Sequence, residues 1–142
     1  MVGLRFKTGA LLVEEQNIIQ AGFDRHSALQ SAPSFEKSRL NWLVYNDENS
    51  LVGALTADTS WDWVYIDELW TDESVRGMGL GTKLMDAVEK HAISQRATGI
   101  WLWTQSWQAA DFYRGLGYEE FTRFENFPKG HSRIGFRKSL NY

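Results

Sequence analysis

A short glycine-rich segment between a strand-like and a helix-like stretch constrains this chain most. Residues 72–82 read Asp-Glu-Ser-Val-Arg-Gly-Met-Gly-Leu-Gly-Thr, with glycine at every second position from 77 to 81. Glycine lets the backbone adopt left-handed angles and come close to a ligand. A helix that begins here offers unpaired N–H groups and the positive end of its dipole to an anion. The segment therefore predicts a binding site for a diphosphate.

Two well-known phosphate-binding patterns fit the glycine spacing poorly. A dinucleotide fingerprint needs Gly-x-Gly-x-x-Gly directly after a strand, but Gly81 comes one residue early and Thr82 stands at the third glycine position. A P-loop needs Gly-Lys-Ser/Thr, whereas Lys83 follows Thr82 here. A nucleotide-binding module is therefore a disfavoured alternative.

A different signature matches the segment better. Residues 76–81, Arg-Gly-Met-Gly-Leu-Gly, resemble the Arg/Gln-x-x-Gly-x-Gly/Ala signature of the GNAT superfamily of N-acetyltransferases. Residues 125–132 are similar to a branch of small bacterial members that have Pro-x-Gly-His after the last helix. The resemblance runs from about residue 51 to the C-terminus.

A second motif supports this resemblance. Residues 106–118 resemble the later GNAT signature, commonly Asn-x-x-Ala-x-x-Phe-Tyr-x-x-x-Gly-Phe. The matching residues are Ala109, Phe112, Tyr113 and Gly117, while Tyr118 replaces Phe and Ser106 replaces Asn. Two signatures in the family's order and spacing together indicate the GNAT fold.

Composition and charge set limits on the class of protein. The 142 residues suit a single domain, here GNAT-like over residues 1–142, and 43% apolar with 23% charged residues is typical of a globular chain. The absence of cysteine excludes disulfides, thiol catalysis and a cysteine zinc site, and we expect no metal. No stretch resembles a membrane span or a secretory signal, so we expect a cytoplasmic protein. The net charge of −3 disfavours a nucleic-acid partner and favours a cationic amine.

Hydrophobic spacing and turn residues predict the order of the elements. We expect helices over residues 11–23, from residue 80 and over 107–114, and strands over 42–45, 51–55, 61–71, 100–104 and around a turn at 128–130. Polar turns are expected at residues 46–50 and 58–60. The strand–helix–strand unit around residue 80 implies a parallel pair with a right-handed crossover. The predicted fold class is α/β (α+β): a mixed, mostly antiparallel sheet with a central parallel pair and helices on both faces.

The resemblance also implies a site. Acetyl-CoA would bind as co-substrate, with its diphosphate on residues 77–82 and its pantetheine arm along the strand that ends at residues 69–71. In the family this strand and the next splay apart, and the acceptor amine attacks the thioester directly. The implied cofactor-binding residues are Leu69, Trp70, Thr71, Arg76, Gly77, Met78, Gly79, Leu80, Gly81, Thr82, Ser106, Ala109 and Phe112.

Catalysis requires a base for the amine and a donor for the departing thiolate. A lysine-like amine has a pKa near 10.4, so its neutral form costs about 4–5 kcal/mol at pH 7, and a carboxylate or water chain must take the proton. Glu68 is the preferred base and Asp67 the alternative. Because strand neighbours point to opposite faces, at most one is expected to serve, and either could instead be a solvated or salt-bridged carboxylate. The resemblance assigns Tyr113 as the donor to sulfur; otherwise it is a packed aromatic.

Other residues keep two interpretations. Arg76 either contacts a phosphate or forms a salt bridge that shapes the loop. His131 either binds substrate or shuttles protons, or, more often for a histidine after such a turn, is structural. The seven tryptophans favour an aromatic layer between sheet and helices, with Trp61 and Trp63 on one face and Trp101 and Trp103 beside them. In the alternative, a tryptophan binds a cationic amine through its ring. The candidates are Trp70, Trp103 and Trp107.

The function that follows is N-acetylation of a primary amine on a small molecule or peptide, with the acceptor left open. The main alternative is a sensor of the same fold that binds acyl-CoA without acylating anything. A homodimer is one option for the assembly.

Overall fold

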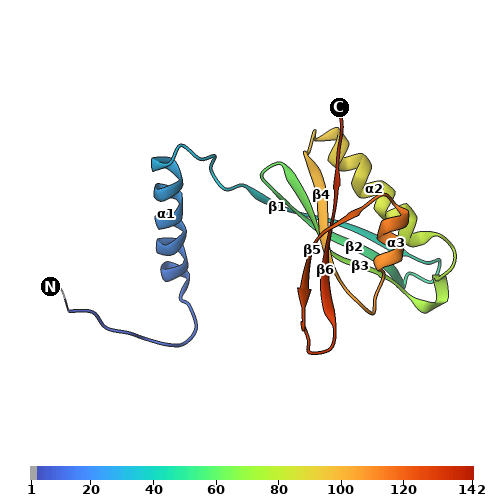
Figure 1. Cartoon of the computed structure of the whole chain (residues 1–142), viewed down its shortest axis with the longest axis horizontal. Helices are drawn as coiled ribbons and strands as arrows, with labels where there is room; N and C mark the ends of the chain where they lie inside the picture. Colours follow the sequence, from blue (N-terminus) through green and yellow to red (C-terminus); the bar gives the residue numbers. More distant parts are fainter. Residues whose placement is uncertain (1–2) are drawn as a thin grey trace. The chain divides into compact units, whose positions relative to one another are not determined.

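The computed structural model describes residues 3–142, which divide into two compact units, one ending at Phe35 and the other spanning Glu36–Tyr142 (Figure 1). The first unit contains helix α1, Val13–Leu29, as the spacing of apolar residues predicts. Its first turn is fixed by the Leu12 N–H, which donates to the Glu15 carboxylate at 2.8 Å. A single domain over the whole chain stays a prediction.

The second unit is built on one six-stranded sheet with the strand order β1-β2-β3-β4-β6-β5. The strands are β1 Lys37–Tyr45, β2 Leu51–Ser60, β3 Trp63–Thr71, β4 Gly99–Gln105, β5 Glu119–Glu125 and β6 Ser132–Ser139. Neighbouring strands are antiparallel except β3 and β4, which are parallel and are connected through helix α2, Leu80–Ser94. The predicted mixed sheet with a central parallel pair is confirmed.

One predicted turn is wrong. The polar residues 58–60 continue β2, and the chain turns at Trp61, which has a φ of 50°. These residues look like a turn because they are polar, but they pair with polar residues of the edge strand β1: Asp58 accepts from Arg39 and Thr59 shares a hydrogen bond with Ser38. Trp61 therefore does not share a strand face with Trp63.

Both α-helices of the second unit pack on one face of the sheet, and a short 3-10 helix, η1 Glu73–Val75, precedes α2. Helix α2 and the short helix α3, Ala110–Gly115, enclose the main core with the inward residues of the central strands. Leu84, Met85 and Val88 of α2 and Tyr113 of α3 belong to this core. Helices on both faces stay a prediction, since α1 belongs to the other unit. None of the helices within residues 3–142 is long and apolar enough to cross a membrane.

Candidate active site

Strands β3 and β4 pair along only part of their length. Their register runs from Trp63 opposite Gly99 to Ile66 opposite Leu102, yet β3 continues to Thr71. Beyond Ile66 the two strands separate, as the resemblance implies. A splayed parallel pair leaves backbone N–H and C=O groups facing the opening, where an amide-bearing ligand could pair with them.

A β-bulge lies where the strands begin to separate. Thr56 of β2 is opposite Glu68 and Ala57 is opposite Ile66, so Asp67 is the extra residue of β3. A bulge interrupts the alternation of side chains and bends the strand. Asp67 and Glu68 accordingly both line the same cavity, which corrects the expectation that they point to opposite faces.

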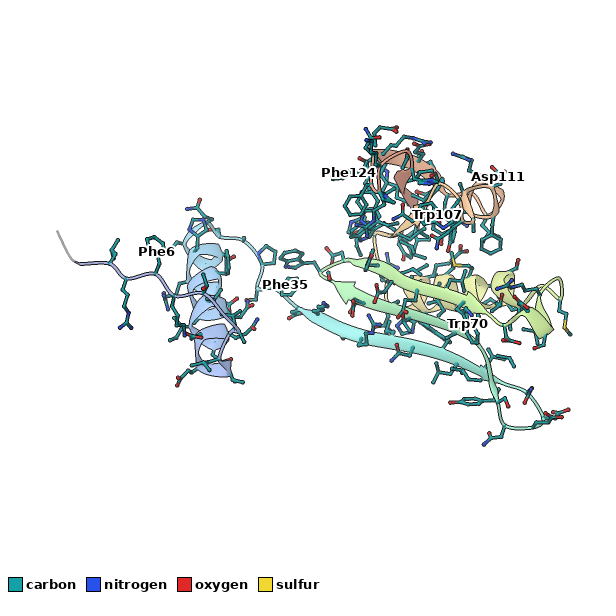
Figure 2. The ribbon with its side chains drawn as sticks, turned by 90° about the horizontal axis from the view of Figure 1, so that it is seen from below. Phe6, Phe35, Trp70, Trp107, Asp111 and Phe124 are labelled. Atoms are coloured by element: carbon teal, nitrogen blue, oxygen red, sulfur yellow. The ribbon has the colours of Figure 1, made fainter. Side chains whose placement is uncertain are left out.

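The cavity at this opening has a volume of about 340 Å³. Its lining comes from β3, β4 and the start of α3: Ile66, Asp67, Glu68, Leu69, Trp70, Leu102, Trp103, Thr104, Gln108, Ala109 and Tyr113. Figure 2 shows Trp70 on β3. All three predicted catalytic residues therefore meet in one space, together with Leu69, Trp70 and Ala109 from the predicted cofactor contacts.

The two carboxylates have different partners. Arg39 Nη1 lies 3.0 Å from Asp67 Oδ2 and 3.1 Å from Asp58 Oδ2, so its guanidinium bridges Asp67 and Asp58. Glu68 Oε1 instead accepts from the Thr56 hydroxyl at 3.1 Å, and Arg39 Nη2 is farther away, at 3.8 Å. Asp67 is therefore tied to a permanent cation, whereas Glu68 has a neutral hydrogen-bond partner.

Tyr113 reaches the cavity from the opposite wall. It is buried, and its ring packs edge-to-face against Phe112 and Tyr118. Burial raises the pKa of Tyr113 to about 12, because the phenolate form is disfavoured away from water. The hydroxyl thus stays protonated at neutral pH and can donate to an anion in the cavity.

The glycine loop leads into α2 with the geometry of an anion site. Gly77 and Gly79 have φ values of 78° and 77°, which side chains rarely adopt. Gly79 is the N-cap of α2, so no side chain caps the first-turn N–H groups, and no acidic residue lies in that turn. These N–H groups and the positive helix end are therefore available to a phosphate.

The remaining loop residues have individual environments. Arg76 Nε donates to the Thr71 carbonyl at 3.4 Å and Nη1 lies 4.0 Å from Glu73, so the side chain shapes the loop here. Its contact to a phosphate stays a prediction. Met78 and Thr82 are exposed, the latter in the first turn of α2. Leu80 packs against Gly53: a Cβ added to Gly53 would lie 2.8 Å from the Leu80 Cδ2 atom.

The predicted contacts from the second motif separate into two groups. Phe112 lies beside the glycine loop, because a Cβ added to Gly81 would be 3.5 Å from its ring. Ser106 instead joins β4 to β6: its N–H donates to the Ser132 carbonyl at 2.8 Å, and its Oγ accepts from the Ser132 N–H at 3.1 Å. Ser106 is outside the lining of the cavity, and a role in cofactor binding stays a prediction.

Two further candidates pack against each other. The rings of Trp107 and His131 are 4.8 Å apart, edge to face, and neither lines the cavity. The His131 N–H also donates to the Pro128 carbonyl at 2.9 Å, which closes the turn between β5 and β6. The structural interpretation of His131 therefore gains support. Figure 2 shows Trp107 in the segment before α3.

Comparison with known proteins agrees with this geometry. Residues 12–118 match the acetyltransferase (GNAT) family. The chain belongs to the GNAT acetyltransferase family. Blasticidin-S acetyltransferase of Streptomyces morookaense is 31% identical over 107 residues, which cover 72% of this chain and 79% of that protein.

Solved structures with the GNAT fold extend the match. The crystal structure of an acetyltransferase from Bacillus cereus has a TM-score of 0.83 and 29% identity, and the match covers 96% of this chain and 98% of that one. An aminoglycoside 6'-N-acetyltransferase complexed with coenzyme A has a TM-score of 0.64 and 19% identity, with 73% and 74% of the two chains covered. The chain is thus an acetyl-transferring GNAT enzyme.

Several residues of this GNAT site were not apparent from the sequence. Arg39 bonds to Asp67, which lies 28 residues later in the chain, and Thr56 bonds to Glu68, which lies 12 residues later. Gln108 lines the cavity while its Oε1 accepts from the Gln105 N–H at 3.0 Å. Two glutamines at positions 105 and 108 do not by themselves predict this hydrogen bond. Only the pairing of β1, β2 and β3 brings Arg39 to Asp67.

Proposed function

We propose that this GNAT enzyme moves the acetyl group of acetyl-CoA to a primary amine by direct attack in the cavity between β3 and β4. One observation carries the proposal: a single opening brings Asp67 and Glu68 together with the protonated Tyr113. The amine nitrogen bonds to the thioester carbon, and the carbon–sulfur bond breaks. A carboxylate takes the proton of the amine, and the Tyr113 hydroxyl donates a hydrogen bond to the departing thiolate.

The position of the acetyl donor follows from the loop and the splayed strands. Its diphosphate binds the N–H groups at the start of α2, with Gly77 and Gly79 allowing the close approach. Its pantetheine amides then pair with β3 beyond Ile66, where β4 no longer does. This path ends in the cavity beside Tyr113.

Glu68 is the better candidate for the base. Its carboxylate accepts a hydrogen bond from the neutral Thr56 hydroxyl, and 69% of its side chain is exposed, so it can turn toward an acceptor. Asp67 instead forms an ion pair with Arg39 at 3.0 Å, so the guanidinium holds its carboxylate in place. We assign a structural role to the Asp67–Arg39 ion pair, which fixes the position of one carboxylate in the lining of the cavity.

Replacing Glu68 by glutamine tests this assignment. We expect E68Q to lower kcat about 10- to 100-fold, since a positioned base contributes at least that much, and to leave acetyl-CoA affinity unchanged. D67N, its matched amide variant, should mainly raise the KM for a cationic acceptor. Steady-state kinetics of CoA release would measure both. A larger kcat loss in D67N than in E68Q would reverse the two roles.

The acceptor that fits best is a small cationic amine. The cavity combines two carboxylates with the rings of Trp70 and Trp103, and both kinds of group attract ammonium ions. The similar Streptomyces protein is a blasticidin-S acetyltransferase, and blasticidin S is accordingly the first compound to try.

An acceptor screen tests the function itself. Free-CoA release would be followed with blasticidin S, an aminoglycoside, a polyamine and a lysine peptide, each beside a form whose primary amines are already acetylated. We expect release with at least one small cationic amine and none with its acetylated form. Calorimetric binding of acetyl-CoA without release by any amine would favour the sensor instead.

A further inference from the structure

Strand β2 brings a hydroxyl to the carboxylate of Glu68. Thr56 lies directly opposite Glu68 in the antiparallel pairing of β2 and β3, where the register shifts at the bulge. The Thr56 hydroxyl donates to Glu68 Oε1 at 3.1 Å. Side chains that lie opposite each other on neighbouring antiparallel strands are close enough to interact directly. The register of the two strands therefore determines which residue of β2 bonds to Glu68.

The two partners differ in stiffness. Threonine is branched at Cβ and its χ1 angle is restricted, so the Thr56 hydroxyl has a well-defined position on the strand. Glutamate is longer and more flexible, and ordering its side chain costs conformational entropy. A hydrogen bond from a stiff donor to a carboxylate is strong enough to offset part of this cost. Thr56 thus favours conformations of Glu68 in which one carboxylate oxygen is held against β2.

The cations nearest to Glu68 bind other carboxylates more closely. Arg39 Nη1 lies 3.0 Å from Asp67 and 3.1 Å from Asp58, whereas its Nη2 lies 3.8 Å from Glu68. Lys37 lies 3.8 Å from Asp58. The nearer partner of Glu68 is therefore the neutral hydroxyl, which orients the carboxylate without adding a charge beside it. A carboxylate held in this way can still attract a cationic acceptor.

We propose that Thr56 is a positioning residue, which holds Glu68 Oε1 and thereby presents Oε2 to the amine of the acceptor. Because the bond to Thr56 uses Oε1, Oε2 can take the proton of the amine while that bond stays intact. Thr56 is not among the described residues that line the cavity, so it acts through Glu68. This inference rests on the proposed role of Glu68 as the base.

Replacing Thr56 by valine removes the hydroxyl and keeps the branched shape. We expect T56V to lower kcat about 5- to 20-fold, as the loss of a hydrogen bond to a charged group does, and to leave the KM for acetyl-CoA unchanged. T56S keeps the hydroxyl and should recover most of kcat. The matched control is T59V: Thr59 is half-buried in the same strand, but its hydroxyl shares a hydrogen bond with Ser38, so kcat should not change.

A double-mutant cycle shows whether Thr56 acts through Glu68. In the E68Q background, T56V should change kcat less than about twofold, because the base that it orients is already lost. An equal loss in both backgrounds would overturn the inference. So would wild-type kcat in T56V beside a loss in E68Q, which leaves the proposed base intact. Wild-type kcat in E68Q would instead refute the base, and the role of Thr56 with it. Thermal unfolding followed by circular dichroism would show that each variant is folded.

Discussion

Replacing Tyr113 by phenylalanine is expected to lower kcat about 100-fold or more, with little change in acetyl-CoA affinity. The ring packs in the core and phenylalanine keeps that packing, so the substitution removes only the hydroxyl. The hydroxyl stabilises the thiolate, an anion that forms only as the carbon–sulfur bond breaks. An interaction made only in the transition state lowers kcat when it is lost. Steady-state kinetics and calorimetry with acetyl-CoA measure the two quantities separately.

Tyr118 provides the matched control. It is also buried, and its hydroxyl donates to Glu89 Oε1 at 2.9 Å, away from the cavity. We expect Y118F to cost about 1 kcal/mol of stability and to keep kcat close to that of the wild type. Equal kcat values for Y113F and the wild-type protein would remove Tyr113 from the mechanism.

Burial of Tyr113 also determines how its donor form and the stability of the protein depend on pH. Because the pKa of Tyr113 is raised to about 12, its donor form persists throughout the usual assay range. The folded state holds this proton more tightly than the unfolded chain, where the pKa is near 10. The associated stabilisation is therefore full below about pH 10 and is lost as the pH rises through about 12.

Replacing Gly79 by valine is expected to raise the Kd for acetyl-CoA about 100-fold. Gly79 has a φ of 77°, which a β-branched residue adopts only at a cost of about 1–2 kcal/mol, so the loop would change shape. An added Cβ meets no protein atom within 4 Å, and it would occupy the space that the ligand needs. Misplaced N–H groups lose charge-assisted hydrogen bonds worth about 1.5–3 kcal/mol each. Calorimetry with CoA measures the change.

Two variants separate binding from general backbone strain. Gly130 has a φ of 82° with equally open space, in the turn between β5 and β6, so G130V introduces the same strain away from the loop. It should lower thermal stability but leave CoA affinity unchanged. R76A should weaken binding less than G79V, since the loop acts mainly through backbone amides. Unchanged CoA binding by G79V would refute a diphosphate site in this loop.

Local features of the fold could be predicted from the sequence. The alternate glycines of residues 77–81 predicted the loop and the start of α2, because φ angles and helix ends depend on neighbouring residues. The amphipathic spacing predicted α2, and the hairpin between β1 and β2 followed from its polar turn. Tyr113 could be placed in the site through its motif.

Features that depend on pairing between distant strands could not be predicted. The bulge that turns Asp67 and Glu68 to the same cavity arises from the register of β2 and β3. Arg39 looks like an ordinary charged residue of an edge strand until that register places it beside Asp67. The turn at Trp61 was misplaced because polar residues of β2 face polar partners on β1.

The limited pairing of β3 and β4 has a consequence for the mechanical behaviour of the sheet. Within residues 3–142, the ladder that joins strands β1, β2 and β3 to strands β4, β6 and β5 has four residue pairs, from Trp63–Gly99 to Ile66–Leu102. This seam between β3 and β4 is therefore the shortest strand ladder of the sheet. A donor whose amides bond across the seam adds backbone pairs that the polypeptide itself does not make. Bound acetyl-CoA would then raise the thermal stability of the enzyme, in addition to supplying the acetyl group.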